Sequence, residues 1–198
     1  MTETNNTKNS IVEIKDITAG VAALGLLGYG MPGVLAGLAN AGIIQTGSIT
    51  LSMAIFMGGF AMFTAGLMAW KKGDTYSMAA YCSFGLFWFS YAILLLLPVL
   101  GLAKDTGGAG AMAAYLALWG LFTLIMFIGS LKISRALQFV LGTLALVFFL
   151  EAAGTATGIG MFTVVAGYVE VISGLAAIYT ALAPVLNDLY GKTVAPLG

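Results

Sequence analysis

The sequence contains no histidine, one cysteine, few charged residues and only four prolines. Without histidine, and with Cys82 as the only cysteine, the chain has neither a Cys/His metal site nor a disulfide framework. Charged residues make up 8% of the sequence, whereas soluble domains have about a quarter. The formal net charge is zero, and no basic run indicates a nucleic-acid partner. A soluble domain is therefore excluded, and we expect no metal, no cofactor and no nucleic acid.

The sequence consists largely of long apolar runs without charged residues, and 60% of its residues are hydrophobic. No charged residue occurs from Ile17 to Trp70, a length that crosses a bilayer twice at about 20 residues per helix. Loop-forming residues between Asn40 and Ser48 separate these two crossings. The sequence therefore predicts an all-α integral membrane protein, with six transmembrane helices in residues 17–186 between polar tails at 1–16 and 187–198. The four later crossings are expected over about 76–100, 110–131, 136–156 and 161–186.

The positions of the lysines and arginines predict the orientation of the chain. Only Lys104 falls on one side of the predicted helices, and the other seven of the eight basic residues fall on the opposite side. Because basic loops stay in the cytoplasm, we expect both tails to be cytoplasmic. Residues 1–16 lack the apolar core of a signal peptide, so we expect a multi-pass protein of a prokaryotic-type plasma membrane. The seven residues on the cytoplasmic side are Lys8, Lys15, Lys71, Lys72, Lys132, Arg135 and Lys192.

Six helices use nearly all of the 198 residues and leave little chain outside the bilayer. No room remains for a catalytic or ligand-sensing domain, so any activity has to take place between or along the helices. This favours a transporter or a channel over an enzyme. A non-transporting membrane scaffold or sensor is an alternative of a different class, in which glycine-rich helices serve only to pack an oligomer.

The first predicted helix is rich in residues that weaken helices. Glycine lowers helix propensity and an interior proline removes a backbone hydrogen bond, so a helix that only anchors the chain would not favour them. In membranes they are tolerated where neighbouring helices or a polar cavity satisfy the backbone. We therefore predict close helix packing, a helix break that lines a path, or both. The residues concerned surround Tyr29 and are Gly28, Gly30, Pro32 and the GxxxG pair Gly33 and Gly37.

Two acidic residues lie inside predicted membrane helices, Glu151 in the fifth and Glu170 in the sixth. Intramembrane carboxylates are costly, so each is by default a candidate functional residue. No lysine or arginine occupies the centre of a helix to pair with them. A carboxyl that takes up a proton becomes neutral, which makes a proton-coupling role physically reasonable. The structural alternative is that both glutamates donate hydrogen bonds to backbone carbonyls or face water between subunits.

The third predicted helix carries a dense group of aromatic residues. Phe84 and Trp88 are four residues apart and share a helix face, as do Phe87 and Tyr91. Such a cluster in a membrane helix is more often core packing than pore lining. Either face is nevertheless able to narrow a central path.

Several motifs, taken in order, resemble one known family. They are LGLLGYGM at 24–31, KKGDTY at 71–76, SFGLFWFSY at 83–91, YLALWGLFTLIMF at 115–127, LQFVL at 137–141 and VLNDLYGKTVAPLG at 185–198. The pattern is similar to that of the acetate uptake transporters, also called succinate–acetate permeases. The chain departs from it at residues 20–23, where Gly-Val-Ala-Ala replaces the family's Asn-Pro-x-Pro.

The resemblance implies six-helix protomers that assemble as hexamers, each with its own path for acetate and sometimes succinate. It also implies a hydrophobic constriction made by an aromatic of the first helix, an aromatic of the third and a leucine of the fifth. These correspond to Tyr29, Phe84 and Leu144. An acetate ion in a path without cations needs hydrogen-bond donors to replace its water. The candidates for substrate binding are Thr64, Trp88, Ser90, Tyr91 and Thr123.

Two transport mechanisms remain open on this reading. The first is uptake of acetate or related small carboxylates coupled to protons, with Glu170 and Glu151 as the coupling groups. The second is a passive acetate/succinate anion channel in which both glutamates are structural. The non-transporting scaffold is the third alternative.

Overall fold

The computed structural model describes residues 19–104 and 107–198, and within these ranges all regular secondary structure is helical. Six helices in the described ranges are long and apolar enough to cross a membrane, which confirms the predicted all-α membrane fold. The second crossing consists of three consecutive segments that together span Ser48–Lys71. The elements are α1 (Ala22–Asn40), α2 (Ser48–Met53), η1 (Ala54–Ala61), α3 (Met62–Lys71), α4 (Thr75–Val99), α5 (Gly108–Ser130), α6 (Arg135–Thr157) and α7 (Gly160–Tyr190).

Most helix ends lie within a few residues of the predicted ends, but two differ. α7 continues to Tyr190, so its end lies beyond the predicted end at Leu186 and the tail predicted at 187–198 begins only at Gly191. α1 begins at Ala22, later than the membrane entry expected near Ile17. Ile17 and the predicted tail 1–16 lie outside the described residues.

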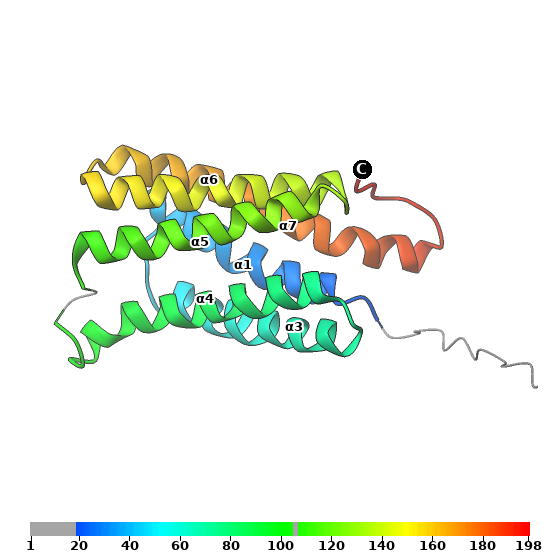
Figure 1. Ribbon diagram of the computed structural model, residues 1–198, viewed down its shortest axis with the longest axis horizontal. Coiled ribbons are helices and arrows are strands. Elements are labelled where there is room, and N and C mark those ends of the chain that lie inside the picture. The colour runs from blue at the N-terminus through cyan, green and yellow to red at the C-terminus, as the bar shows by residue number, and fades with distance from the viewer. Residues whose placement is uncertain (1–18, 105–106) are drawn as a thin grey trace, which may run out of the picture.

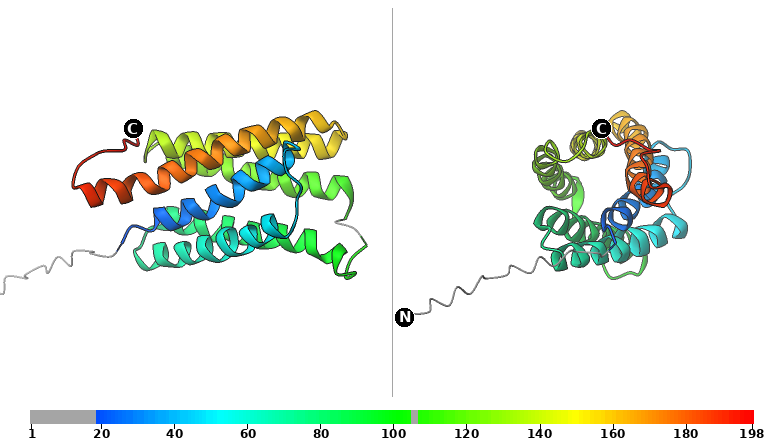
Figure 2. Two further views of the ribbon diagram at one scale, coloured as in Figure 1. Left: turned by 180° about the vertical axis from the view of Figure 1, so that it is seen from behind. Right: turned by 90° about the vertical axis from the view of Figure 1, so that its right-hand side faces the viewer.

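The helices run side by side along the long axis of the molecule (Figure 1), and the end-on view shows them arranged as a ring (Figure 2). α1 lies against α7 and the second crossing, α4 lies against η1 and α3, and α6 lies between α5 and α7. α1 begins and α7 ends at one end of the bundle (Figure 1), where α3 also ends, at Lys71, and α6 begins, at Arg135. We call this the basic end; Asn40 lies toward the opposite end.

Glycines on α1 and α7 allow the backbones of these two helices to come very close. A Cβ atom added to Gly30 would lie 2.7 Å from the carbonyl oxygen of Gly174, and one added to Gly37 would lie 2.7 Å from that of Gly167. These distances are too short for any larger residue unless the backbone shifts. α1 and α7 therefore meet along a seam that only glycine fits, as small residues do between membrane helices.

Two further glycines of α1, Gly28 and Gly33, do not face α7. Gly28 faces the second crossing, where an added Cβ would lie 2.9 Å from the carbonyl oxygen of Met57. Gly33 lies under the ring of Tyr29 on the same helix, with 3.0 Å between an added Cβ and the nearest ring carbon. Both positions thus serve packing, one between helices and one beneath an aromatic ring.

The helix break predicted near Pro32 is wrong, because α1 runs unbroken from Ala22 to Asn40 with Pro32 buried inside it. The irregular backbone lies instead in the second crossing, where η1 is a stretch of the wider π-helix. Within η1, Gly58 faces the ring of Trp88 and Gly59 faces the ring of Phe89. The glycine pair therefore leaves space for two large α4 side chains beside the distorted turn.

The carboxyl-terminal tail folds back against the basic end (Figure 1). The Asn187 side chain holds it by accepting hydrogen bonds from the backbone N–H groups of Val194 and Ala195, at 2.7 and 2.9 Å. The backbone N–H of Ala136 donates to the carbonyl oxygen of Leu197 at 3.0 Å. The tail is thereby fixed to both α7 and the start of α6.

Candidate functional site

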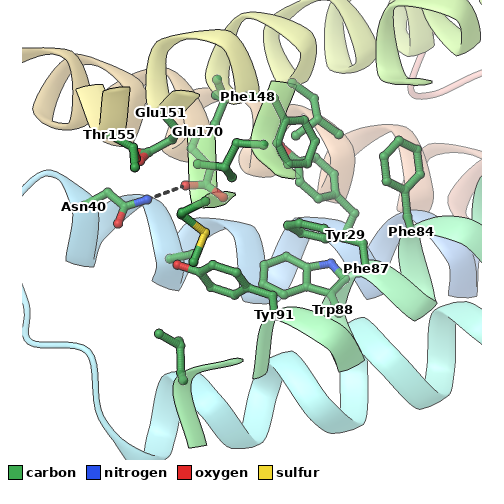
Figure 3. Close-up of a pocket in the computed structure, with 16 residues that line it drawn as sticks. Tyr29, Asn40, Phe84, Phe87, Trp88, Tyr91, Phe148, Glu151, Thr155 and Glu170 are labelled. Carbon is green, nitrogen blue, oxygen red and sulfur yellow. Dashed lines mark hydrogen bonds between the residues drawn. The ribbon is translucent and has the colours of Figure 1, made fainter. Parts of the chain in front are cut away.

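Two of the cavities between the described helices share a wall, and they lie one toward each end of the bundle. The carboxylate cavity has a volume of about 150 Å³, and Asn40, Glu151 and Glu170 are among its lining residues (Figure 3). The basal cavity has a volume of about 590 Å³ and includes Asp74 and Ser134 near the basic end. Among the described residues that line either cavity there is no lysine or arginine. A ligand inside would therefore meet aromatic rings, hydroxyls, an amide and carboxyls.

Three bulky residues separate the two cavities. Tyr29, Phe84 and Leu144 line both, and no other described residue does. They project from α1, α4 and α6, and each side chain is 5% exposed. The three residues that the family resemblance assigns to a constriction thus form the shared wall between the cavities.

The Tyr29 ring is anchored by a buried relay of hydrogen bonds. Its hydroxyl donates to the Ser173 hydroxyl at 2.9 Å, and Ser173 donates to the carbonyl oxygen of Val140 at 3.1 Å. Ser173 is fully buried. The relay crosses from α1 through α7 to α6, so it fixes the ring at the shared wall. The sequence reading missed Ser173, which lies one turn beyond Glu170 on α7.

Glu170 is 7% exposed and points from α7 into the carboxylate cavity (Figure 3). The Asn40 side-chain amide donates a hydrogen bond to Glu170 Oε2 at 3.3 Å. The sequence reading took Asn40 for the first residue of a loop, whereas it is the last residue of α1. Its spacing of three residues from Gly37 was the available signal that it lies on the α7-facing side of α1.

Glu151 reaches the same cavity from α6 (Figure 3). Its Oε1 atom is buried and has no hydrogen-bond partner among the described residues. The expected structural alternative, a hydrogen bond to a backbone carbonyl, is therefore not observed at this oxygen. Thr155 lines the cavity one turn further along α6.

Aromatic side chains of α4 form one wall of the carboxylate cavity, and two of the candidate substrate-binding residues, Trp88 and Tyr91, belong to it. Phe87 stacks on Tyr91 with ring centroids 5.8 Å apart and meets Phe148 of α6 edge-on at 5.1 Å. Phe87 also contacts Trp119 of α5 at 5.1 Å. The wall is therefore continuous with the aromatic packing between α4, α5 and α6.

The other three candidates for substrate binding line neither cavity. Thr64 is exposed on the outer surface of α3. The Ser90 hydroxyl donates to the carbonyl oxygen of Phe87 at 2.9 Å and lies 2.6 Å from the Tyr115 hydroxyl. Thr123 is fully buried and donates to the carbonyl oxygen of Trp119 at 2.7 Å. Their hydroxyls satisfy the helix backbone or face outward, so all three lie away from both cavities, and their role in substrate binding stays a prediction.

The fold and the site define a helical multi-pass membrane protein with two cavities in line through its core. Comparison with known proteins agrees: residues 4–195 match the model of the GPR1/FUN34/yaaH family, and the chain belongs to this family. The resemblance to succinate–acetate permeases is thereby confirmed. The chain is 44% identical over 180 residues to the succinate-acetate/proton symporter SatP of Escherichia coli K12, covering 91% of this chain and 95% of that protein.

A solved structure, described as that of the bacterial acetate channel SatP, is similar to the whole membrane bundle. Its TM-score is 0.89 at 44% identity, and the match covers 91% of this chain and 99% of the other. A protein of Methanothermobacter thermautotrophicus is 42% identical over 202 residues, which cover 99% of each chain. The descriptions of the SatP proteins use both "symporter" and "channel", so the likeness itself does not choose between the two mechanisms.

Proposed function

We propose that this protein moves acetate and related small carboxylates across the membrane, through a path within each protomer. The observation that carries the proposal is the shared wall: Tyr29, Phe84 and Leu144 alone among the described residues line both cavities. A wall of three bulky side chains between two cavities suits the passage of small molecules one at a time. The similarity to proteins described as a succinate-acetate/proton symporter and an acetate channel supports acetate as a substrate.

The proposed orientation places the basic end in the cytoplasm, because basic residues favour that side. The carboxylate cavity then opens toward the outside and the basal cavity toward the cytoplasm. A substrate that enters from outside meets Trp88 and Tyr91 first, then the shared wall. The protein works as a transporter and not as an enzyme.

We further propose that acetate moves together with a proton. Two carboxylates in one small cavity cannot both stay ionised cheaply, and an acetate ion adds a third negative charge. Among the residues that the structure describes, no basic one lines the cavity to balance that charge. A proton held by Glu170 or Glu151 offsets the added charge and links acetate entry to proton entry.

The decisive measurement is uptake of labelled acetate into proteoliposomes under an imposed pH gradient, for the wild type and Glu170→Gln. Gradient-driven accumulation that the variant loses would support coupling through this carboxyl. Asp188→Asn is the matched control, because it removes an exposed carboxylate from the same helix and lines neither cavity. Accumulation in the wild type that Glu170→Gln retains would contradict this role.

The passive channel remains the second candidate, and the description of the similar solved structure as a channel favours it. Equal downhill flux in wild type and Glu170→Gln, without accumulation beyond the leak of neutral acetic acid through lipid, would support it. If well-folded protein produced no acetate flux above that of empty liposomes, the non-transporting scaffold would be the remaining alternative. One set of liposomes therefore separates all three alternatives.

We also propose that the protein assembles as a homo-oligomer in the bilayer, a hexamer by family resemblance. Large apolar side chains face outward from the second crossing, including Phe56 at 64% exposed and Phe60 at 56%. Such surfaces have to contact lipid or other copies of the chain. Native mass spectrometry from detergent or lipid nanodiscs would count the subunits, and a monomer would overturn the proposal.

A further inference from the structure

The tail that follows α7 forms part of the basal cavity. It leaves the helix at Gly191, whose φ of +61° is a left-handed conformation that favours glycine and ends the helix. The tail then crosses to the start of α6 at the basic end (Figure 1). Leu197 is half-buried and lines the basal cavity together with Asp74 and Ser134, which cap the starts of α4 and α6. The lining of this cavity at the basic end is therefore formed in part by the tail.

Side chains of α7 hold the middle of the tail. Asn187 accepts hydrogen bonds from the backbone N–H groups of Val194 and Ala195, and its amide donates to the Ala195 carbonyl oxygen at 2.9 Å. The Tyr179 hydroxyl donates to the carbonyl oxygen of Pro196 at 2.7 Å. These contacts are polar and lie near the surface, so we expect local opening of the tail to require far less free energy than unfolding of the bundle.

The end of the tail contacts the start of α6. The backbone N–H of Ala136 donates to the carbonyl oxygen of Leu197 at 3.0 Å. A Cβ atom added to Gly198 would lie 2.8 Å from the Cβ atom of Arg135. Of residues 191–198, only Ala195 is buried, so few apolar contacts oppose release of the tail from α6.

We propose that the tail is a gate at the basic end of the path. It turns away from α6 about Gly191, and Leu197 leaves the lining of the basal cavity when a substrate passes. This inference rests on the proposed function and adds a second barrier to it. The basal cavity, of about 590 Å³, then lies between the shared wall on one side and the gate on the other. With the gate closed, the apolar Leu197 side chain stands where a carboxylate would need water or a donor.

The sharpest test locks the tail reversibly. Arg135→Cys/Gly198→Cys, in a Cys82→Ala background, places two thiols at the contact between the tail and α6. The two Cβ positions are 2.8 Å apart, and a disulfide needs about 3.5–4.5 Å, so a shift of about one ångström suffices. Downhill acetate flux in proteoliposomes is measured after oxidation with copper–phenanthroline and again after dithiothreitol. We expect oxidation to lower the flux at least about tenfold and reduction to restore it, because a gate that cannot open stops each passage.

The two single-cysteine variants in the same background are the controls. Arg135→Cys shows the effect of the lost charge, and Gly198→Cys shows the strain of a side chain at a φ of +82°. Oxidation should leave the flux of both unchanged. Equal flux of the oxidised and reduced double variant, with the disulfide confirmed by mass, would overturn the gate and make the tail a fixed part of the wall. A wild type without acetate flux above empty liposomes would instead remove the proposed function.

A labelling experiment tests the gate without any flux and decides the question if the disulfide does not form. Thr180 is buried and lines the basal cavity, so Thr180→Cys in the Cys82→Ala background reports access for a charged methanethiosulfonate reagent. Asn187→Ala releases the tail and should speed the modification at least about tenfold through the lost hydrogen bonds. Val194→Ala, a tail change at a 44% exposed residue that lines neither cavity, should keep the rate. An unchanged rate in Asn187→Ala contradicts the gate.

Discussion

Asn40, the last residue of α1, donates a hydrogen bond to Glu170 of α7 across 3.3 Å, although 130 positions separate them in the sequence. The pair sits beside the seam where Gly37 of α1 meets Gly167 of α7. Close backbone packing brings the short amide within reach of the carboxyl. The position of a candidate coupling residue therefore depends on glycines that never touch a substrate.

The first prediction concerns this hydrogen bond. Asn40→Ala removes the donor and leaves one oxygen of a buried carboxyl without its partner, which costs about 1–3 kcal/mol. We expect a lower melting temperature in detergent. Ser52→Ala is the control, because the exposed Ser52 hydroxyl bonds only to a backbone carbonyl of its own helical turn. Equal melting temperatures for Asn40→Ala and the control would show that the bond contributes nothing.

The second prediction concerns the α1–α7 seam. Gly30→Ala puts a methyl group 2.7 Å from a backbone carbonyl oxygen, and such overpacking costs about 1–3 kcal/mol. Gly110→Ala is the matched control, because it is also helical and has open space around it. That change should be neutral or slightly stabilising, since alanine favours helix more than glycine. Thermal unfolding of both variants measures the difference, which should vanish if the seam can widen freely.

The third prediction concerns the shared wall. Leu144→Ala removes bulk between the two cavities and should raise downhill acetate flux, while costing about 2–5 kcal/mol of stability as a buried large-to-small change. Leu144→Phe should lower the flux by closing the same space. Leu118→Ala, at a position 68% exposed on α5, serves as control. Flux that responds to neither Leu144 change would place the rate-limiting barrier elsewhere.

The fourth prediction concerns the relay that holds Tyr29. Tyr29→Phe and Ser173→Ala each break the 2.9 Å hydrogen bond between their hydroxyls. Because both remove the same contact, their combined effect on unfolding free energy should be smaller than the sum, by about 0.5–1.5 kcal/mol. A double-mutant cycle from chemical or thermal unfolding gives this number. Strict additivity would mean that the two hydroxyls do not depend on each other.

The helices could be predicted from sequence because uncharged apolar runs of bilayer length leave few alternatives. The same reasoning was wrong at Pro32, where local helix propensity argued for a break. A proline removes one hydrogen-bond donor, but close packing of α1 on α7 keeps the chain helical on both sides of it. The distortion occurs instead at η1, which contains the adjacent glycines Gly58 and Gly59.

Some residues of the candidate site could likewise be predicted from the sequence, and others could not. Intramembrane carboxylates are rare and costly, so Glu151 and Glu170 stood out in the sequence, and both line one cavity. Hydroxyl residues carry no such signal, because a membrane helix can satisfy them with its own carbonyls, as happens at Thr123. Ser173 was missed because its hydrogen-bond partner, Tyr29, lies on a helix far away in the sequence, and sequence spacing gives no sign of such a contact.

The folded-back tail has a practical consequence for work on this protein. Leu197 lines the basal cavity, and its carbonyl oxygen accepts the hydrogen bond from Ala136. A fluorescent reporter or affinity tag joined to the carboxyl terminus would be attached through Gly198, whose backbone lies against the Arg135 side chain. A group joined after Gly198 begins one residue beyond Leu197, which lines this cavity. Untagged protein is therefore the proper reference for any flux measurement.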